Sequence, residues 1–103
     1  MTSQNLETLP VVTSAEPKLN NLQAKFGWTR QQLLYRMSVL GNWYIDKEND
    51  DNINIFLSRP DYVTVPGYIR VTIDPTRQRI ISAGLNKHKD VQRGVLTGRF
   101  LPL

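Results

Sequence analysis

The stretch FGWTRQQLLYRMSVLGNWY, residues 26–44, carries the strongest local folding signals in the chain. Thr29 is followed three residues later by Gln32, and this spacing is typical of a capping box at the start of a helix. The apolar residues that follow lie at helical spacing and share one face: Leu33, Leu34, Met37 and Leu40. Gly41 then suits a left-handed residue at the end of the helix. The stretch therefore predicts an amphipathic helix over residues 29–40.

A shorter helix is predicted just before this one, over residues 14–27. Ser14 can cap its start and Pro17 suits its first turn, while Gly27 is placed to end it. Its apolar residues also recur at helical spacing: Leu19, Leu22 and Phe26. Residues 1–14 show no period and contain many polar residues, so they predict a flexible arm that precedes the folded domain.

After the second helix the hydrophobic repeat shortens from about 3.6 residues to about 2, which indicates β-strands. Residues 43–46 and 53–57 form one predicted hairpin around a polar loop. Residues 68–73 and 79–83 form a second one around the turn DPTR. The predicted fold class is α+β, with one or two N-terminal helices packed on a small antiparallel sheet of about four strands built from the two hairpins. A single domain over residues 15–84 would contain these elements.

Charge is distributed unevenly along the 103 residues, whose net charge is +4. Residues 1–43 contain four Lys or Arg and two Asp or Glu, residues 44–74 contain three and six, and residues 75–103 contain six and one. Residues 85–103 are therefore predicted to form a basic tail with an apolar tip around Phe100, with room for one short helix around residues 89–93. Such a segment favours an acidic partner, whether nucleic acid, phospholipid headgroups or an acidic protein surface, or it is simply solvated.

Composition excludes several kinds of chemistry. The chain has no cysteine, which removes disulfides, thiol catalysis and thiolate metal sites and favours a reducing compartment. No apolar run approaches the roughly 18 residues that span a bilayer, so we expect a cytoplasmic protein without a membrane span. His88 lies between two lysines with no orienting partner in view. A calcium loop that began at Asp46 would need glycine at its sixth position and glutamate at its twelfth, where this chain has Asp51 and Leu57. We expect neither a cofactor nor enzymatic activity.

Residues 22–37, LQAKFGWTRQQLLYRM, resemble a helix-turn-helix with its turn at Gly27. The residues that follow resemble the wing hairpin of winged-helix proteins, so the resemblance covers residues 19–58. It implies that polar residues early in the second helix face the bases of DNA: Thr29, Arg30, Gln31 and Tyr35. It also implies that Lys25 and Arg36 contact phosphates. Two ordinary helices that meet at a glycine and pack on a sheet would show the same pattern.

Two functions therefore fit the sequence. The first is a small non-enzymatic assembly or adaptor protein that docks on a larger complex through its N-terminal arm and basic C-terminal tail. The second is a winged-helix-like regulator that binds nucleic acid. The candidate contacts with a partner or a nucleic acid are Arg30, Gln31, Tyr35, Arg77, Arg79, Lys87, Lys89, Arg93, Arg99 and Phe100. Both functions leave the oligomeric state open.

Overall fold

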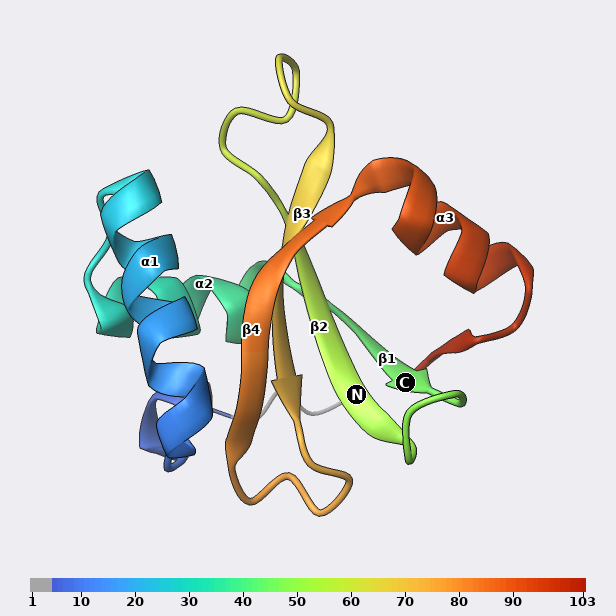
Figure 1. Cartoon of the computed structure of the whole chain (residues 1–103), viewed down its shortest axis with the longest axis horizontal. Helices are drawn as coiled ribbons and strands as arrows, with labels where there is room; N and C mark the ends of the chain where they lie inside the picture. The colour runs from blue at the N-terminus through green and yellow to red at the C-terminus, as the bar shows by residue number, and fades with distance from the viewer. Residues whose placement is uncertain (1–4) are drawn as a thin grey trace.

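The computed structural model describes residues 5–103 of the chain. Within them the chain forms short 3-10 helices, α-helices and one sheet of five strands (Figure 1). In chain order the elements are η1 (Leu6–Thr8), η2 (Thr13–Ala15), α1 (Glu16–Phe26), α2 (Arg30–Leu40), β1 (Asn42–Asp46), β2 (Asn52–Ser58), β3 (Gly67–Ile73), β4 (Ile80–Lys87), α3 (His88–Leu96) and β5 (Phe100–Pro102). The predicted α+β class is confirmed, and β5 is an addition to the predicted sheet. No helix of the described chain has both the length and the apolar character needed to cross a membrane.

The sheet is antiparallel, with the strand order β4-β3-β2-β1-β5. β1 pairs with β2 and β3 pairs with β4, so both predicted hairpins are confirmed. Ile55 in β2 lies opposite Trp43 in β1 and Val71 in β3, and this register gathers apolar side chains on one face. β5 joins the other edge of β1, where Leu101 lies opposite Ile45.

Local signals place α1 and α2 close to the predicted ranges, but the cap predicted at Ser14 is wrong, because α1 begins after Ala15 without a side-chain cap. Thr29 Oγ1 accepts a hydrogen bond from the Gln32 N–H at 3.1 Å, and Gln32 Oε1 accepts one from the Thr29 N–H at 3.0 Å, so the capping box is confirmed. Gly27 ends α1 in the left-handed region with a φ of 69°. The left-handed end predicted at Gly41 is wrong, because its φ is -72°. Glycine is needed there for another reason, since a Cβ would overlap the Met37 carbonyl oxygen.

Helices cover both faces of the sheet to different extents. α1 and α2 lie on one face, and α3 covers part of the opposite face (Figure 1). The larger core lies under α1 and α2 and contains Leu19, Leu22, Leu33, Leu34, Met37, Trp43, Ile53, Ile55, Ile69, Val71 and Ile73. Leu40 was predicted to share this apolar face but is 62% exposed. The smaller core lies under α3 and contains Phe56, Val91 and Phe100.

The prediction of a flexible arm is wrong for residues 5–14, and the first four residues of that arm lie outside the described part of the chain. Leu6 is fully buried, and its N–H donates a hydrogen bond to Ser38 Oγ at 3.1 Å. Val11 forms a parallel β-bridge with Ile80 at the start of β4. Both partners are remote in sequence, so no local period could indicate that this segment packs on the domain.

The prediction of a basic tail over residues 85–103 is also wrong. These residues complete β4, form α3 and return as β5 on the edge of the sheet. The short helix predicted around residues 89–93 is confirmed as α3. Phe100, predicted to be part of an exposed tip, is 6% exposed and packs so closely on Gly94 that a Cβ there would overlap its ring. A strand of three residues has no readable period of its own, and pairing with β1 is what forms it.

Candidate functional site

A polar cavity, which we call the sheet cavity, lies on the face of the sheet that α3 covers in part. Its volume is about 190 Å³. It is lined by Asp46, Asn49, Asn52, Asn54, Arg70, Thr72, Ile81, Ser82, Asn86, Asp90, Arg99 and Phe100. Asp46 is 1% exposed, Thr72 4% and Asn54 5%. Burial of a polar group costs free energy unless hydrogen bonds replace its water, so the partners of these side chains decide what the cavity can do.

The register of the sheet brings the polar side chains of the sheet cavity to one face. Asn54 in β2 lies opposite Thr72 in β3, and Thr72 lies opposite Ser82 in β4. Arg70 lies two residues before Thr72 and therefore on the same face, because side chains alternate along a strand. The other face of the same strands carries the isoleucine and valine side chains of the larger core. The larger apolar core and the sheet cavity thus lie on opposite faces, and the face of the sheet cavity also carries Phe56 of the smaller core.

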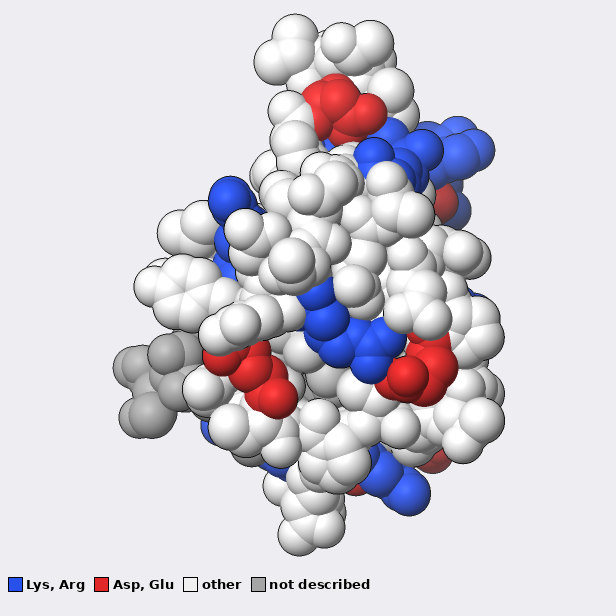
Figure 2. All heavy atoms as spheres, turned by 90° about the vertical axis from the view of Figure 1, so that its left-hand side faces the viewer, with Lys and Arg blue, Asp and Glu red and all other residues white. Residues whose placement is uncertain are grey.

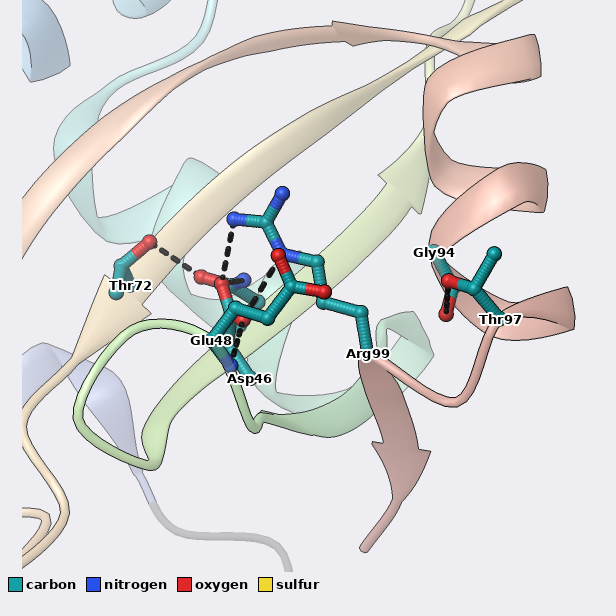
Figure 3. Close-up of polar contacts among 7 residues, drawn as sticks. Asp46, Glu48, Thr72, Gly94, Thr97 and Arg99 are labelled. Atoms are coloured by element: carbon teal, nitrogen blue, oxygen red, sulfur yellow. Dashed lines mark hydrogen bonds and ion pairs between the residues drawn. The ribbon is translucent and has the colours of Figure 1, made fainter.

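Asp46 is the centre of a hydrogen-bond network at one end of the sheet cavity (Figure 3). Arg99 Nε donates to Asp46 Oδ1 at 3.0 Å, and Arg99 Nη2 donates to Oδ2 at 3.1 Å. The Glu48 N–H donates to Oδ1 at 3.1 Å, and Asn54 Nδ2 donates to Oδ2 at 3.3 Å. Thr72 Oγ1 donates to Asn54 Oδ1 at 2.6 Å and so fixes the orientation of that amide. Hydrogen bonds from Arg99 to the carboxylate raise the pKa of Arg99, which therefore stays positively charged.

Among residues 5–103, Arg70 is the cation at the wall of the sheet cavity that forms no ion pair with an acidic side chain. Its Nη1 donates to Asn86 Oδ1 at 3.2 Å and its Nη2 donates to Ser82 Oγ at 3.1 Å. Its buried Nε has no hydrogen-bond partner in the described part of the chain. No ion pair in residues 5–103 includes it. Burial lowers the pKa of Arg70, and the charge of Asp46 acts in the opposite direction. A guanidinium has five N–H donors, so Arg70 retains capacity to bind an anion.

The lining of the sheet cavity suits an anion better than a metal ion. Arg70 supplies a half-buried positive charge, and neighbouring amide and hydroxyl groups supply further donors. In the part of the chain that the structure describes, no group of three or more His, Asp or Glu side chains could hold a metal ion. The carboxylate of Asp46 is already bound by Arg99 and is not free to act on a ligand.

Of the candidate contacts predicted on α2, Arg30 and Gln31 line one cavity, and Tyr35 lies outside its lining. Arg30 donates hydrogen bonds to Glu16 and, at 3.1 Å, to Gln23 Oε1, so its guanidinium ties α2 to α1. Gln31 and Tyr35 are exposed on the surface of α2. Figure 2 shows the side of the molecule that carries α1, where most of the surface is uncharged and basic side chains lie beside acidic ones at several places. This side therefore has charges of both signs interspersed.

The remaining candidate contacts are distributed over three regions. Arg77 and Arg79 lie in the turn between β3 and β4, where Arg79 pairs with Asp74 at 3.3 Å. Exposed basic residues at the end of β4 and on α3 form a separate group: Lys87, Lys89 and Arg93. Of the predicted contacts, Arg99 and Phe100 line the sheet cavity.

Sequence patterns missed most of the sheet cavity for a physical reason. Asn54, Arg70 and Thr72 occupy the polar positions of alternating strands, and such positions usually face water. They are enclosed only because α3 and β5 return over this face, and those residues were predicted to form a tail. The available signal was a cluster of polar residues at matching positions of adjacent strands, which becomes informative once the register is known.

Comparisons with known proteins identify no relative of this chain. A scan against models of protein families and searches of curated proteins and of solved structures found no match. Inference about function therefore depends on the geometry of the site.

Proposed function

We propose that this chain is a small non-enzymatic protein that binds a carboxylate-bearing ligand in the sheet cavity. The observation that carries this proposal is the state of Arg70, a half-buried cation at the cavity wall without an ion pair in residues 5–103. The two oxygens of a carboxylate match the planar fork of a guanidinium, so such a ligand could form two parallel hydrogen bonds. The carboxylate of the ligand would also form the ion pair that Arg70 lacks within residues 5–103.

Size and charge narrow the class of ligand. A volume of about 190 Å³ lies below the roughly 300–1,000 Å³ of pockets that hold drug-sized molecules, so we expect a short organic acid. Asp90 on α3 also lines the cavity, and its negative charge disfavours a second carboxylate on the same ligand. We therefore expect a monocarboxylate. A cytoplasmic location remains part of the proposal and rests on composition alone.

Arg70→Met is expected to weaken binding of short monocarboxylates at least about ten-fold, because the variant removes charge-assisted hydrogen bonds. Acetate, propionate, lactate and pyruvate can be titrated at constant ionic strength, with chloride as the reference anion, and binding followed through amide chemical shifts of β3 and β4. At a concentration of 100 times Kd, a bound acid should add about 2.7 kcal/mol to the free energy of unfolding.

Arg79→Met is the matched control for this experiment, because it removes the same charge from an exposed position outside the cavity. It is expected to leave the affinity unchanged. Arg70→Lys keeps the charge but loses the fork, so an intermediate affinity is expected. The proposal is wrong if no short acid shifts the amides of the wild-type cavity, or if Arg79→Met weakens binding as much as Arg70→Met.

Docking on a protein partner is a second candidate function, and the outer surface of α2 favours it. Tyr35 is 58% exposed, Val39 54% and Leu40 62%. Tyr35 and Val39 are four residues apart and so lie on the same side of the helix. Exposed apolar residues that gather in one place are typical of interaction sites. The adaptor function predicted from the sequence would then use α2 as its docking surface.

Val39 and Leu40 are replaced together by aspartate to test this surface. We expect that a protein partner that copurifies with the wild-type chain no longer copurifies with the double variant. The free energy of unfolding should change by no more than about 1 kcal/mol, because both side chains are exposed. Binding of a short acid should persist. Unchanged copurification would exclude α2 as the docking surface.

A gel shift at low salt tests the nucleic-acid alternative, since a basic nucleic-acid-binding protein retains non-specific affinity for nucleic acid at low salt.

A further inference from the structure

We propose that a second cavity binds an uncharged compound with one aromatic ring and one hydroxyl group, that is, a simple phenol. This cavity, which we call the aromatic cavity, has a volume of about 200 Å³. Tyr44, Phe56 and Tyr68 line it from β1, β2 and β3, and Val91 and Leu96 line it from α3. Within residues 5–103 it shares no lining residue with the sheet cavity, so this proposal is independent of the proposed function.

The chemistry of the lining favours an uncharged ligand. No Lys, Arg, Asp or Glu side chain of the described chain lines the aromatic cavity. A charged ligand would therefore lose its hydration without gaining an ion pair, and that loss is costly. An apolar cavity of about 150 Å³ can hold benzene, so the aromatic cavity has room for one ring with small substituents.

The aromatic side chains are arranged to pack against a further ring. The ring centroids of Tyr44 and Phe56 are 6.0 Å apart, and those of Phe56 and Tyr68 are 6.1 Å apart with an interplanar angle of 64°. These are the separations and tilts at which aromatic rings attract one another. A ligand ring in the cavity can therefore make edge-to-face contacts of the same kind with several protein rings.

His88 provides the polar contact that distinguishes a phenol from a plain hydrocarbon. It lines the aromatic cavity, and its Nδ1 lies 2.7 Å from Tyr62 Oη and 3.2 Å from Tyr68 Oη. Burial, together with the neighbouring Tyr62 hydroxyl, raises the pKa of Tyr68, so that hydroxyl stays protonated. Nδ1 is thus bonded within the protein, whereas no hydrogen bond in residues 5–103 uses Nε2. We assign the hydroxyl of the ligand to this nitrogen.

The probe that tests this assignment is p-cresol, compared with toluene, which has the same ring and methyl group but no hydroxyl. Titration is followed by the backbone amide chemical shifts of Phe56, Tyr68 and Val91. We expect saturable shifts and a Kd about five-fold lower for p-cresol than for toluene, because one net hydrogen bond contributes about that factor. Equal affinities would overturn the role of His88, and shifts confined to β3 residues around Arg70 would overturn the aromatic cavity as the site.

Variants separate filling of the cavity from damage to the fold. Val95 lines the aromatic cavity and is 39% exposed, so Val95→Phe is expected to fill the space and abolish saturable p-cresol binding. Val39→Phe, the same change on α2 at the opposite face of the sheet, is the control and should bind as the wild type does. Retention of p-cresol binding by Val95→Phe would overturn the proposal, provided that its amide spectrum shows a folded protein.

Two further comparisons test the polar contact and the charge requirement. His88→Ala is expected to bring the affinities for p-cresol and toluene to the same value, because it removes the imidazole that contacts the hydroxyl. Benzoate, which carries a charge on the same ring, is expected not to shift the amides of the aromatic cavity. Benzoate binding there as tight as that of p-cresol would overturn the requirement for an uncharged ligand. Arg70→Met should leave p-cresol binding unchanged, because Arg70 lines the sheet cavity and not the aromatic cavity. Failure of one proposal can therefore be distinguished from failure of the other.

Discussion

Replacement of Phe100 by alanine is expected to lower the free energy of unfolding by about 3–5 kcal/mol. The side chain is 6% exposed, and its ring centroid lies 5.3 Å from that of Phe56 and 6.5 Å from that of Tyr44. Loss of the ring would leave a cavity between α3 and the sheet, and it would remove the contact by which Gly94 packs on β5. Urea unfolding followed by tryptophan fluorescence measures this change.

Leu101→Ala is the matched control, because Leu101 is the next residue of β5 and is 42% exposed. It is expected to cost no more than about 1 kcal/mol. The comparison also tests the structure of the C-terminal segment. If Phe100→Ala is as stable as the wild-type protein, residues 85–103 are a tail after all and do not belong to the folded domain.

Asp46→Asn is expected to lower the free energy of unfolding by about 2–3 kcal/mol, because it leaves Arg99 without its anion inside the cavity wall. The Asp46 side chain is 2% exposed and that of Arg99 is 40% exposed, so water compensates only part of the loss. The amide keeps the shape of the carboxylate but cannot accept both hydrogen bonds from the guanidinium. Chemical denaturation at neutral pH measures the effect.

Asp51→Asn is the control for the loss of an exposed acidic partner. Its ion pair with Lys47 spans 2.9 Å, but the two side chains are 56% and 48% exposed, so we expect a change below about 1 kcal/mol.

A double-mutant cycle that combines Asp46→Asn with Arg99→Met measures the coupling between these two residues. The free energy of unfolding lost by the double variant should be smaller than the sum of the losses of the two single variants. Additive losses would mean that the network around Asp46 does not stabilise the fold through Arg99.

Elements stabilised by near neighbours could be predicted from the sequence. The capping box of Thr29 and Gln32 lies within four residues, and Gly27 ends α1 through its own backbone conformation. Both hairpins follow from alternation and a turn. In each case the partner lies close along the chain, so the pattern that specifies the structure is contained in a short window.

The candidate sites could not be predicted in the same way. Arg70 occupies a polar position of an alternating strand, and nothing near it in sequence shows that α3 will close over it. His88 sits between two lysines in a basic segment, yet its hydrogen-bond partner Tyr62 comes from a loop 26 residues away. The candidate contacts on α2 were selected by their chemistry, and Arg30 proved to be bonded to α1.

The sequence by itself determined the α+β class, the two N-terminal helices and the hairpins, because their signals act over a few residues. The tertiary structure alone decided that Leu6 and Phe100 are buried and that the polar face of the sheet encloses a cavity. The reason is distance along the chain: the ion pair that closes this cavity joins residues 53 positions apart, Asp46 and Arg99. Contacts of that range depend on how all the elements pack together, and no local pattern encodes them.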